Sequence, residues 1–495
     1  FAQFTREKPG VIMTSAKWME GMSGMEQRRD MRLENDLGKD PVGKLVFRIA
    51  IPSMLAQLVS VLYGIVDRVY IGNIPEVGSL ALAGAGVCGP ILTLVAAFAF
   101  WIGIGGSPLM SIRMGEGRLD EARKIMSNCF MLLTVFALVL TTLALLVRRP
   151  LLLLFGASES TLGFALDYYT IYVCGTLFAL LSTGMNQFII CQGFAKKSMV
   201  SVMLGAVLNI LLDPLFIFVL NLGVRGAAIA TVISQLASCV YVLCFLAGPV
   251  PPVRIALGGY QWKTIRRVLV MGMAPFLMYA IDSVMVIALN TILQRYGGQA
   301  QGDQLVAAAT ISQSFLLLVT LPLGGITGGT GSILGFNFGA GRPDRIWEAE
   351  KYILALALIF TSTLMLLGQG GAAMFARLFT PDPQVAALAA RAVRLTTLGI
   401  ITLALQYVVV DGFTGMGMMQ FALPLSLLRK VFYFTALFLL PMAGGAMAAF
   451  FAQAASDIVP PILSALVYWN RRSWVTRQAD QRSRLQERQQ AVQSI

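Results

Sequence analysis

Twelve apolar runs, each long enough to cross a lipid bilayer, restrict the fold of this chain more than any other feature of its sequence. A helix needs roughly twenty apolar residues to span a hydrocarbon layer about 30 Å thick. Of the residues, 57% are hydrophobic and 13% are charged, whereas about a quarter are charged in a soluble domain. The sequence therefore predicts an all-α polytopic membrane protein. The predicted spans cover approximately residues 47–71, 82–114, 125–147, 166–191, 198–220, 226–246, 268–293, 305–338, 352–372, 389–415, 421–440 and 444–469.

Basic residues are divided unevenly between the two sets of loops that connect these spans. The richer set contains Arg113, Arg118, Arg123, Lys124, Lys196, Lys197, Arg254, Lys263, Arg266, Arg267, Arg342, Arg345, Lys351, Arg429 and Lys430. The poorer set contains Arg148, Arg149, Arg225, Arg295 and Arg377. Short loops rich in Lys and Arg stay in the cytoplasm. We therefore expect the richer set and both termini to be cytoplasmic, which explains the net charge of +13 without a nucleic-acid partner.

The inventory of reactive side chains argues against an enzyme. The chain has no histidine, and its six cysteines form no Cys-x-x-Cys pair. We expect the cysteines to be small buried side chains, without a disulfide framework or a zinc site. An integral-membrane enzyme would need a nucleophile–base pair or a polar cluster at the interface, and the sequence offers neither. Any proton chemistry inside the membrane then belongs to carboxylates.

The two halves of the chain resemble each other at a nearly constant offset. Pro52 matches Pro275, 223 residues later, and Gly193 matches Gly417, 224 residues later. "MGEGR" before the third span likewise matches "FGAGR" before the ninth. Two halves with an even number of spans enter the membrane in the same orientation, with a cavity between them. The predicted organisation is a polar N-terminal extension (1–46), an N-lobe (47–247), a cytoplasmic linker (248–264), a C-lobe (265–470) and a basic tail (471–495).

Ionisable residues inside a span are costly and usually functional. Helix rise, counted from Arg48 and Lys197, places Asp67 roughly 28 Å and Asp213 roughly 24 Å from the cytoplasmic side, and counted from Arg225 it places Thr231 roughly 9 Å from the outside. Asn209 shares a helix face with Asp213 four residues later. We expect these four side chains to form one oxygen-rich site that takes up a proton or Na⁺. Asn186, nearer mid-depth, could belong to this site or join two helices.

The second half carries three further buried acids, Asp282, Asp411 and Asp457. Each is a candidate for a substrate site or a second proton site. The position equivalent to Asp67 is Asn290, so the two halves are expected to differ chemically.

Several segments resemble the multidrug and toxic compound extrusion (MATE) family. They are "AIPSMLAQLVSVLYGIVDRVYIG" in the first span, "LNILLDPLFIF" in the fifth, "GVRGAAIATVISQ" in the sixth and "GSILGFNFGAG" at the end of the eighth. The likeness covers approximately residues 37–469. The segments "ENDLGKDPVGKL" and "ASDIVPPILSAL" are similar to the MepA-like bacterial branch of the family.

This resemblance implies a V-shaped transporter with two pseudo-symmetric six-helix lobes that is driven by protons or sodium. Asp67, Asn209, Asp213 and Thr231 fall on the family's first-half cation site, and Asn186 matches the asparagine that its fourth span contributes. Pro52 falls on the proline at which the first span is thought to bend. In the second half, Asp282 and Asp411 lie near acidic positions that some sodium-coupled members use.

The predicted function is therefore a proton- or sodium-coupled antiporter that exports small organic, cationic drugs or toxins. We expect a monomer in the bacterial plasma membrane that needs no cofactor beyond the coupling ion. Three alternatives remain. A flippase of lipid-linked oligosaccharides would need basic residues in the central cavity, and mid-span lysine and arginine are almost absent from the predicted spans. A membrane enzyme is disfavoured by the missing nucleophile–base pair. A receptor or channel fits the doubled architecture with buried acids less well.

The predicted topology can be tested with a reporter fused after Trp469. We expect only a cytoplasmic reporter to be active there, because the basic loops and the even span count put both termini inside. A periplasmic signal at this position would refute the topology.

Overall fold

The structure is a computed structural model that describes residues 36–75, 77–155, 159–379 and 382–493. Eleven helical segments within these residues are long and apolar enough to cross a membrane. A twelfth span consists of two helices that meet at Gly175 with a bend of 54°. The prediction of an all-helical membrane protein with twelve spans is therefore confirmed.

The first six spans form the N-lobe. Its elements are α2 (Val42–Gly72), α3 (Gly78–Gly115), α4 (Leu119–Leu146), α5 (Arg148–Leu154), α6 (Glu159–Cys174), α7 (Thr176–Ile190), α8 (Ala195–Pro214), the π-helix η1 (Leu215–Val219) and α9 (Gly223–Ala247). The bent pair α6–α7 makes the fourth span, and α8 with η1 makes the fifth.

The last six spans form the C-lobe. Its elements are α10 (Trp262–Gly339), α11 (Pro343–Phe379), α12 (Pro383–Thr396), the 3₁₀-helix η2 (Thr397–Gly399), α13 (Ile400–Gly415), α14 (Met419–Gly444), the 3₁₀-helix η3 (Ala446–Phe450) and α15 (Phe451–Gln493). Gly298, with a φ of 61°, divides α10 into two spans.

The repeat seen in the sequence recurs in the backbone at the helix corners. Gly117 (φ 75°) and Gly341 (φ 66°) end the second and eighth spans, and Gly193 (φ 90°) and Gly417 (φ 76°) end the fourth and tenth. At each corner, the N–H of the residue after the glycine donates to a carbonyl five residues back, as in a Schellman motif. Only glycine adopts a positive φ at little cost, so equivalent glycines terminate equivalent helices.

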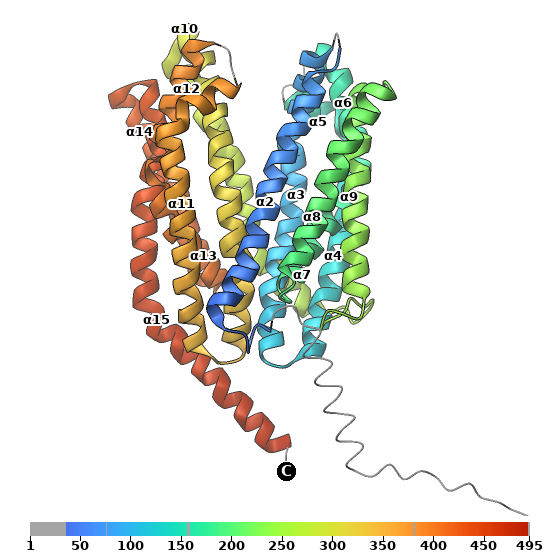
Figure 1. Ribbon diagram of the computed structural model, residues 1–495, viewed down its shortest axis with the longest axis vertical. Coiled ribbons are helices and arrows are strands. Elements are labelled where there is room, and N and C mark those ends of the chain that lie inside the picture. The colour runs from blue at the N-terminus through green and yellow to red at the C-terminus, as the bar shows by residue number, and fades with distance from the viewer. Residues whose placement is uncertain (1–35, 76, 156–158, 380–381, 494–495) are drawn as a thin grey trace, which may run out of the picture.

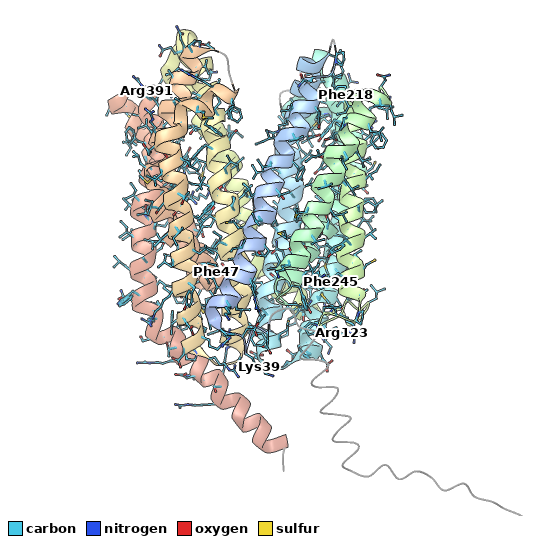
Figure 2. All side chains as sticks on the ribbon, in the orientation of Figure 1. Lys39, Phe47, Arg123, Phe218, Phe245 and Arg391 are labelled. Carbon is cyan, nitrogen blue, oxygen red and sulfur yellow. The ribbon has the colours of Figure 1, made fainter. Side chains whose placement is uncertain are left out.

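The two lobes lie close together at one end of the molecule and diverge towards the other (Figure 1). We call these the convergent end and the divergent end. Figure 2 labels Lys39 and Arg123 at the convergent end, whereas Phe218 and Arg391 lie towards the divergent end. The loops with the richer set of basic residues thus gather where the lobes meet.

Small residues let the lobes approach each other at the convergent end. A Cβ on Gly105 of α3 would lie 2.5 Å from the Val268 carbonyl oxygen of α10, so no larger side chain fits there. Nearer the corner, Ser111 Oγ donates to the Ser332 carbonyl oxygen at 2.8 Å. Such close backbone approach, without long interlocking side chains, resembles the small-residue packing of membrane helices.

Aromatic rings continue this contact towards the middle of the molecule. The ring of Trp101 on α3 lies 4.6 Å from that of Phe276 on α10, and Phe100 stacks on Tyr279 at 5.0 Å. Among these ring contacts Tyr279 is the α10 residue farthest from the convergent end. These two ring pairs therefore extend the contact between α3 and α10.

The chain on the N-terminal side of α2 also contacts the C-lobe. Leu37 is buried, and its carbonyl oxygen accepts hydrogen bonds from Asn337 Nδ2 at 3.1 Å and Arg345 Nη2 at 3.3 Å. Residues 1–35 of the predicted extension lie outside the described residues. The described part, from Asp36 onwards, packs against the C-lobe, and α2 begins at Val42 within the range given to the extension.

The last helix, α15, continues past the C-lobe and runs along the convergent end (Figure 1). Val475 and Ala479 in this extension are fully buried. Arg482 forms an ion pair with Glu116 at the end of α3, and its guanidinium group lies 4.6 Å from the centre of the Phe338 ring. The C-terminal helix therefore contacts both lobes.

Two basic residues that we assigned to a loop lie elsewhere. Arg429 and Lys430 lie inside α14, about 15 Å from its first residue, and both are largely buried. Each is paired with an aspartate, which is why a membrane helix tolerates them. The assignment of these two residues to a cytoplasmic loop is therefore wrong.

We expect cysteines at positions 116 and 482, in a variant lacking the six native cysteines, to be joined by a short bifunctional thiol reagent. A linker is needed because an ion pair of these long side chains spans more than a disulfide. The matched control pairs position 116 with Asp480, which projects from a different side of α15. Efficient linking of the control, or none of the test pair, would contradict this arrangement.

Candidate functional site

A cluster of oxygen-bearing side chains is buried in the N-lobe between α8 and α9. Asn209 Nδ2 donates to Asp213 Oδ1 at 3.1 Å and to Thr231 Oγ1 at 3.3 Å. All three residues are buried, and Asp213 is fully so. Asn209 and Asp213 share a helix face because they are four residues apart. Thr231 Oγ1 itself donates to the Ala227 carbonyl oxygen at 3.0 Å, so one lone pair remains available beside the one that accepts from Asn209.

Asp67 completes this cluster from α2. Its carboxyl group and that of Asp213 lie within hydrogen-bonding reach of each other, although such a bond forms only when one of them carries a proton. Two carboxylates this close in a low-dielectric interior repel each other when both are charged. The structure therefore brings together the four residues Asp67, Asn209, Asp213 and Thr231, as the sequence predicts.

Several oxygens of this cluster have no hydrogen-bond donor among the described residues. They are Asp67 Oδ1, Asn209 Oδ1 and Asp213 Oδ2. A buried oxygen without a donor is costly, and native structures rarely leave one so. A proton between the carboxyl groups, or a hard cation that prefers oxygen ligands, would supply what these atoms lack. The residues present thus fit a proton or Na⁺ site.

Local sequence explains why this site lies beside an irregular helix. Pro214 follows Asp213 and has no N–H to donate, which weakens the hydrogen-bond ladder of α8. The next five residues form the π-helix η1 instead. Gly226 allows η1 to pack closely, because a Cβ there would lie 2.6 Å from the Phe216 carbonyl oxygen. π-Helical turns occur often at functional sites.

Tyrosines around Asp67 are part of this environment and were not predicted. Tyr63, Tyr168 and Tyr172 all lie near enough to interact electrostatically with its carboxyl group. Tyr172 accepts a hydrogen bond from Gln235 Nε2 at 3.1 Å. Tyr168 and Tyr172 could have been found from the motif "LDYYTIY" before the bend at Gly175, because three tyrosines in one apolar run are unusual for a membrane span.

Asn186 and Pro52 are the other predicted N-lobe residues. Asn186 on α7 is buried and its Oδ1 has no donor among the described residues, but no hydrogen bond joins it to the Asp67–Asp213 cluster. α2 continues as a helix through Pro52, which is buried. The neighbouring Ser53 faces α10, where a Cβ on Gly325 would lie 2.7 Å from the Ser53 carbonyl oxygen.

The acids of the C-lobe fall into different surroundings. Asp411 on α13 accepts a hydrogen bond from Thr327 Oγ1 of α10 at 2.5 Å. The phenols of Tyr279 and Tyr407 lie near its carboxyl group. No ion pair joins Asp411 to a described basic residue. It is therefore a half-buried carboxylate within electrostatic range of two tyrosine hydroxyl groups.

Asp457 on α15 is fully buried and surrounded by donors. Arg429 Nε lies 2.9 Å from its Oδ1, Gln453 Nε2 donates to its Oδ2 at 2.7 Å, and Ser456 Oγ lies 3.4 Å from Oδ1. A carboxylate with no exposed surface and with both oxygens bonded has the character of a structural ion pair.

Asp282 on α10 forms an ion pair with Lys430 of α14. Its side chain is 54% exposed, whereas that of Lys430 is 6% exposed. Asp282 is three residues from Tyr279, which stacks against the N-lobe, so both lie on the helix face that points towards the space between the lobes. Because Arg429 and Lys430 are each paired with an aspartate, they give this cluster no excess positive charge for a pyrophosphate group.

A buried glutamate was missed altogether. Glu350 on α11 is 7% exposed and accepts a hydrogen bond from the Tyr468 hydroxyl group of α15. Periodicity could have found it, because Glu350 lies on the same buried helix face as Ile346, Ile353 and Ala357. The predicted ninth span began two residues later, which excluded it from consideration.

Comparison with protein families finds one model, MatE, that matches residues 52–215 and 275–435. The two matches begin at Pro52 and Pro275, the pair that marks the internal repeat. Among curated proteins, "Multidrug export protein MepA" of Staphylococcus haemolyticus (strain JCSC1435) is 24% identical over 375 residues, which cover 75% of this chain and 80% of that protein. The MepA protein of Staphylococcus aureus (strain MSSA476) is 24% identical over 380 residues, covering 76% and 82%.

Solved structures share the fold. One is described as the outward-facing conformation of a multidrug resistance MATE family transporter; it has a TM-score of 0.82 at 22% identity and covers 89% of this chain and 98% of its own. A transporter from Pyrococcus furiosus, described as having a binding pocket of reverse polarity, has a TM-score of 0.83 at 22% identity with the same coverage.

Whether the Arg429–Asp457 ion pair stabilises the fold can be tested by removing its two charges in turn. We expect Arg429→Met to cost about 3–5 kcal/mol of stability, because it leaves Asp457 as an uncompensated buried charge. Adding Asp457→Asn should recover most of this loss. The measurement is the thermal unfolding midpoint in detergent, with Arg225→Met, which removes an exposed ion pair with Asp167, as the control. Equal midpoints for the single and double variants would contradict a structural pair.

Proposed function

The chain belongs to the MatE family of membrane transporters, and we propose that it is a cation-coupled antiporter that exports small organic cations by alternating access. The observation that carries this proposal is the Asp67–Asp213 carboxyl pair, whose oxygens Asp67 Oδ1 and Asp213 Oδ2 have no donor among the described residues. Such a pair gains a favourable interaction each time it takes up a proton or a cation. It therefore responds to an ion gradient.

The helix α2 supplies a physical route from this site to the contact between the lobes. Asp67 lies in the half of α2 near the divergent end, and Ser53 of the same helix packs against Gly325 and Gly329 of α10. Ion loading changes how strongly α2 is held towards α8 at Asp213. A change in the path of α2 at Pro52 would move the Ser53 contact, so the state of the ion site would bias the packing of the lobes.

The C-lobe supplies groups suited to an organic cation. Asp411 offers a carboxylate without a basic partner among the described residues, and Tyr279 and Tyr407 lie beside it. A cation gains from both a carboxylate and nearby aromatic faces. Asp282, exposed towards the space between the lobes, is the second candidate contact. The names of the staphylococcal relatives, multidrug export proteins, support the same substrate class.

Orientation follows from the distribution of charge. The convergent end carries the richer set of basic loops and the basic tail of α15, which favours a cytoplasmic location for it and for both termini. The divergent end would then open to the outside. This arrangement is the one from which a substrate leaves the cell and a coupling ion enters from outside.

We expect Asp67→Asn and Asp213→Asn each to reduce gradient-driven efflux to background while expression and folding stay near normal. Each change removes the charge that a proton or cation neutralises but keeps the shape of the side chain. Efflux of a cationic dye is measured in membrane vesicles with the pH gradient and the sodium gradient imposed separately, which also identifies the ion.

The matched control is Asp167→Asn, an exposed aspartate of the same lobe that pairs with Arg225. It should transport at the wild-type rate. If a correctly inserted Asp67 or Asp213 variant pumps like wild type with the same ion dependence, that carboxylate is not a coupling residue. If wild-type protein exports no organic cation under either gradient, the proposed function is wrong.

A further inference from the structure

Lys430 is a buried basic residue that the proposed transport cycle does not yet use. Its side chain is 6% exposed, yet its ammonium group reaches the carboxylate of Asp282, which is 54% exposed. The pair therefore has one hidden member and one accessible member. A ligand in the space between the lobes can approach Asp282 but meets a carboxylate that already holds a cation.

We propose that Lys430 is a tethered cation that occupies Asp282 in the absence of substrate, and that an organic cation takes its place and causes Lys430 to release a proton. This inference rests on the proposed export of organic cations. It identifies Lys430 as the group that competes with the substrate for Asp282, and the ammonium proton of Lys430 as the proton that is released.

The charges around Lys430 explain why displacement would cost it a proton. Its neighbours are Arg429 on the same helix, Asp282 on α10 and Asp457 on α15. Asp457 is already committed to Arg429 at 2.9 Å and to Gln453. Once Asp282 holds another cation, the ammonium group of Lys430 would be a buried charge beside a like charge. Release of a proton removes that cost, because a neutral amine can be buried far more cheaply.

The remaining titratable groups near Lys430 do not replace Asp282 as its counter-ion. Tyr407 and Asp411 on α13 face the cluster, as do Tyr279 on α10 and Tyr433 on α14. The tyrosines carry no charge near neutral pH, so they cannot replace Asp282 as the counter-ion. Asp411 accepts a hydrogen bond from Thr327 Oγ1 at 2.5 Å, and it is not among the charged groups that act on Lys430, which are Asp282, Arg429 and Asp457.

The two neighbouring basic residues, Arg429 and Lys430, differ in whether their positive charge can be removed. An arginine does not lose its proton in proteins, whereas a lysine with a buried amine does so readily. The arginine is the residue bonded to the fully buried Asp457, and the lysine is the one bonded to the exposed Asp282. The exchange is balanced: one organic cation enters, one proton leaves, and the net charge of the cluster is unchanged.

The test uses purified full-length protein and tetraphenylphosphonium, a cation that has no proton of its own. Affinity and proton release are measured together by calorimetry in buffers of different ionisation enthalpy. Wild type should release about one proton per bound cation, and its affinity should rise with pH. If Lys430 leaves Asp282 free in about a tenth of molecules, Lys430→Met should bind about tenfold more tightly, with the proton release lost.

Three further variants separate the explanations. Lys430→Arg should bind more weakly than wild type without releasing a proton, because the competing charge cannot be removed. Asp282→Asn should lose most of the affinity in either background. Lys351→Met, an exposed lysine of α11, should match wild type.

The inference is overturned if Lys430→Met binds no more tightly than wild type, if it still releases the proton, or if no variant binds the cation. These outcomes are distinguishable from failure of the proposed function. Dye efflux that needs Asp67 and Asp213, combined with unchanged affinity in Lys430→Met, leaves the exporter intact and removes only the role of Lys430. If the binding experiments give the expected pattern but vesicles show no efflux, the role of Lys430 stands and the proposed export function is wrong.

Discussion

The cost of an unpaired polar group in a low-dielectric interior governs this protein at every level. It makes every span helical, because only a helix satisfies its own backbone N–H and C=O groups in lipid. It also explains the buried charges of the C-lobe, where Arg429 is bonded to Asp457 and Lys430 to Asp282. The Asp67–Asp213 pair departs from this pattern, since neither carboxyl group forms an ion pair with a described basic residue. The positive charge that acts on Asp67 is that of the adjacent Arg68. In the proposed function, that departure is where the free energy of an ion gradient would act.

The contact between the lobes combines close backbone approach with aromatic packing. Gly105 of α3 lies against the α10 backbone, and Ser53 of α2 lies against Gly325. Aromatic rings of α3 and α10 stack on each other farther along the same contact. In the proposed alternating access, the short side chains would let the helices pivot, whereas the stacked rings would have to repack. The extension of α15 and the segment before α2 add polar contacts across the same end, through Arg482 and Arg345.

The two lobes share a backbone design but not a chemistry. Equivalent glycines end equivalent helices, as Gly193 and Gly417 do with φ values of 90° and 76°. The N-lobe nevertheless has its carboxyl pair at Asp67, where the C-lobe has Asn290, while the C-lobe has a cluster of both charge signs around Tyr407. In the proposed function, a symmetric frame with unequal sites would assign the coupling ion to the N-lobe and the substrate to the C-lobe.

The sequence alone was enough to predict the twelve spans, the repeat and the Asn209–Asp213–Thr231 cluster with Asp67. Span length, the offset between halves, and spacing along a helix are all local or periodic properties, and depth in the membrane follows from counting residues. Partner choice is not local. That Lys430 reaches Asp282 and Arg429 reaches Asp457 depends on how α14 is rotated against α10 and α15. Helix packing within each lobe likewise buries Glu350 against Tyr468 and leaves Asn186 without a hydrogen bond to the predicted site. The rotation of each helix and the reach of its side chains are set by this packing, which the sequence of a single helix does not specify.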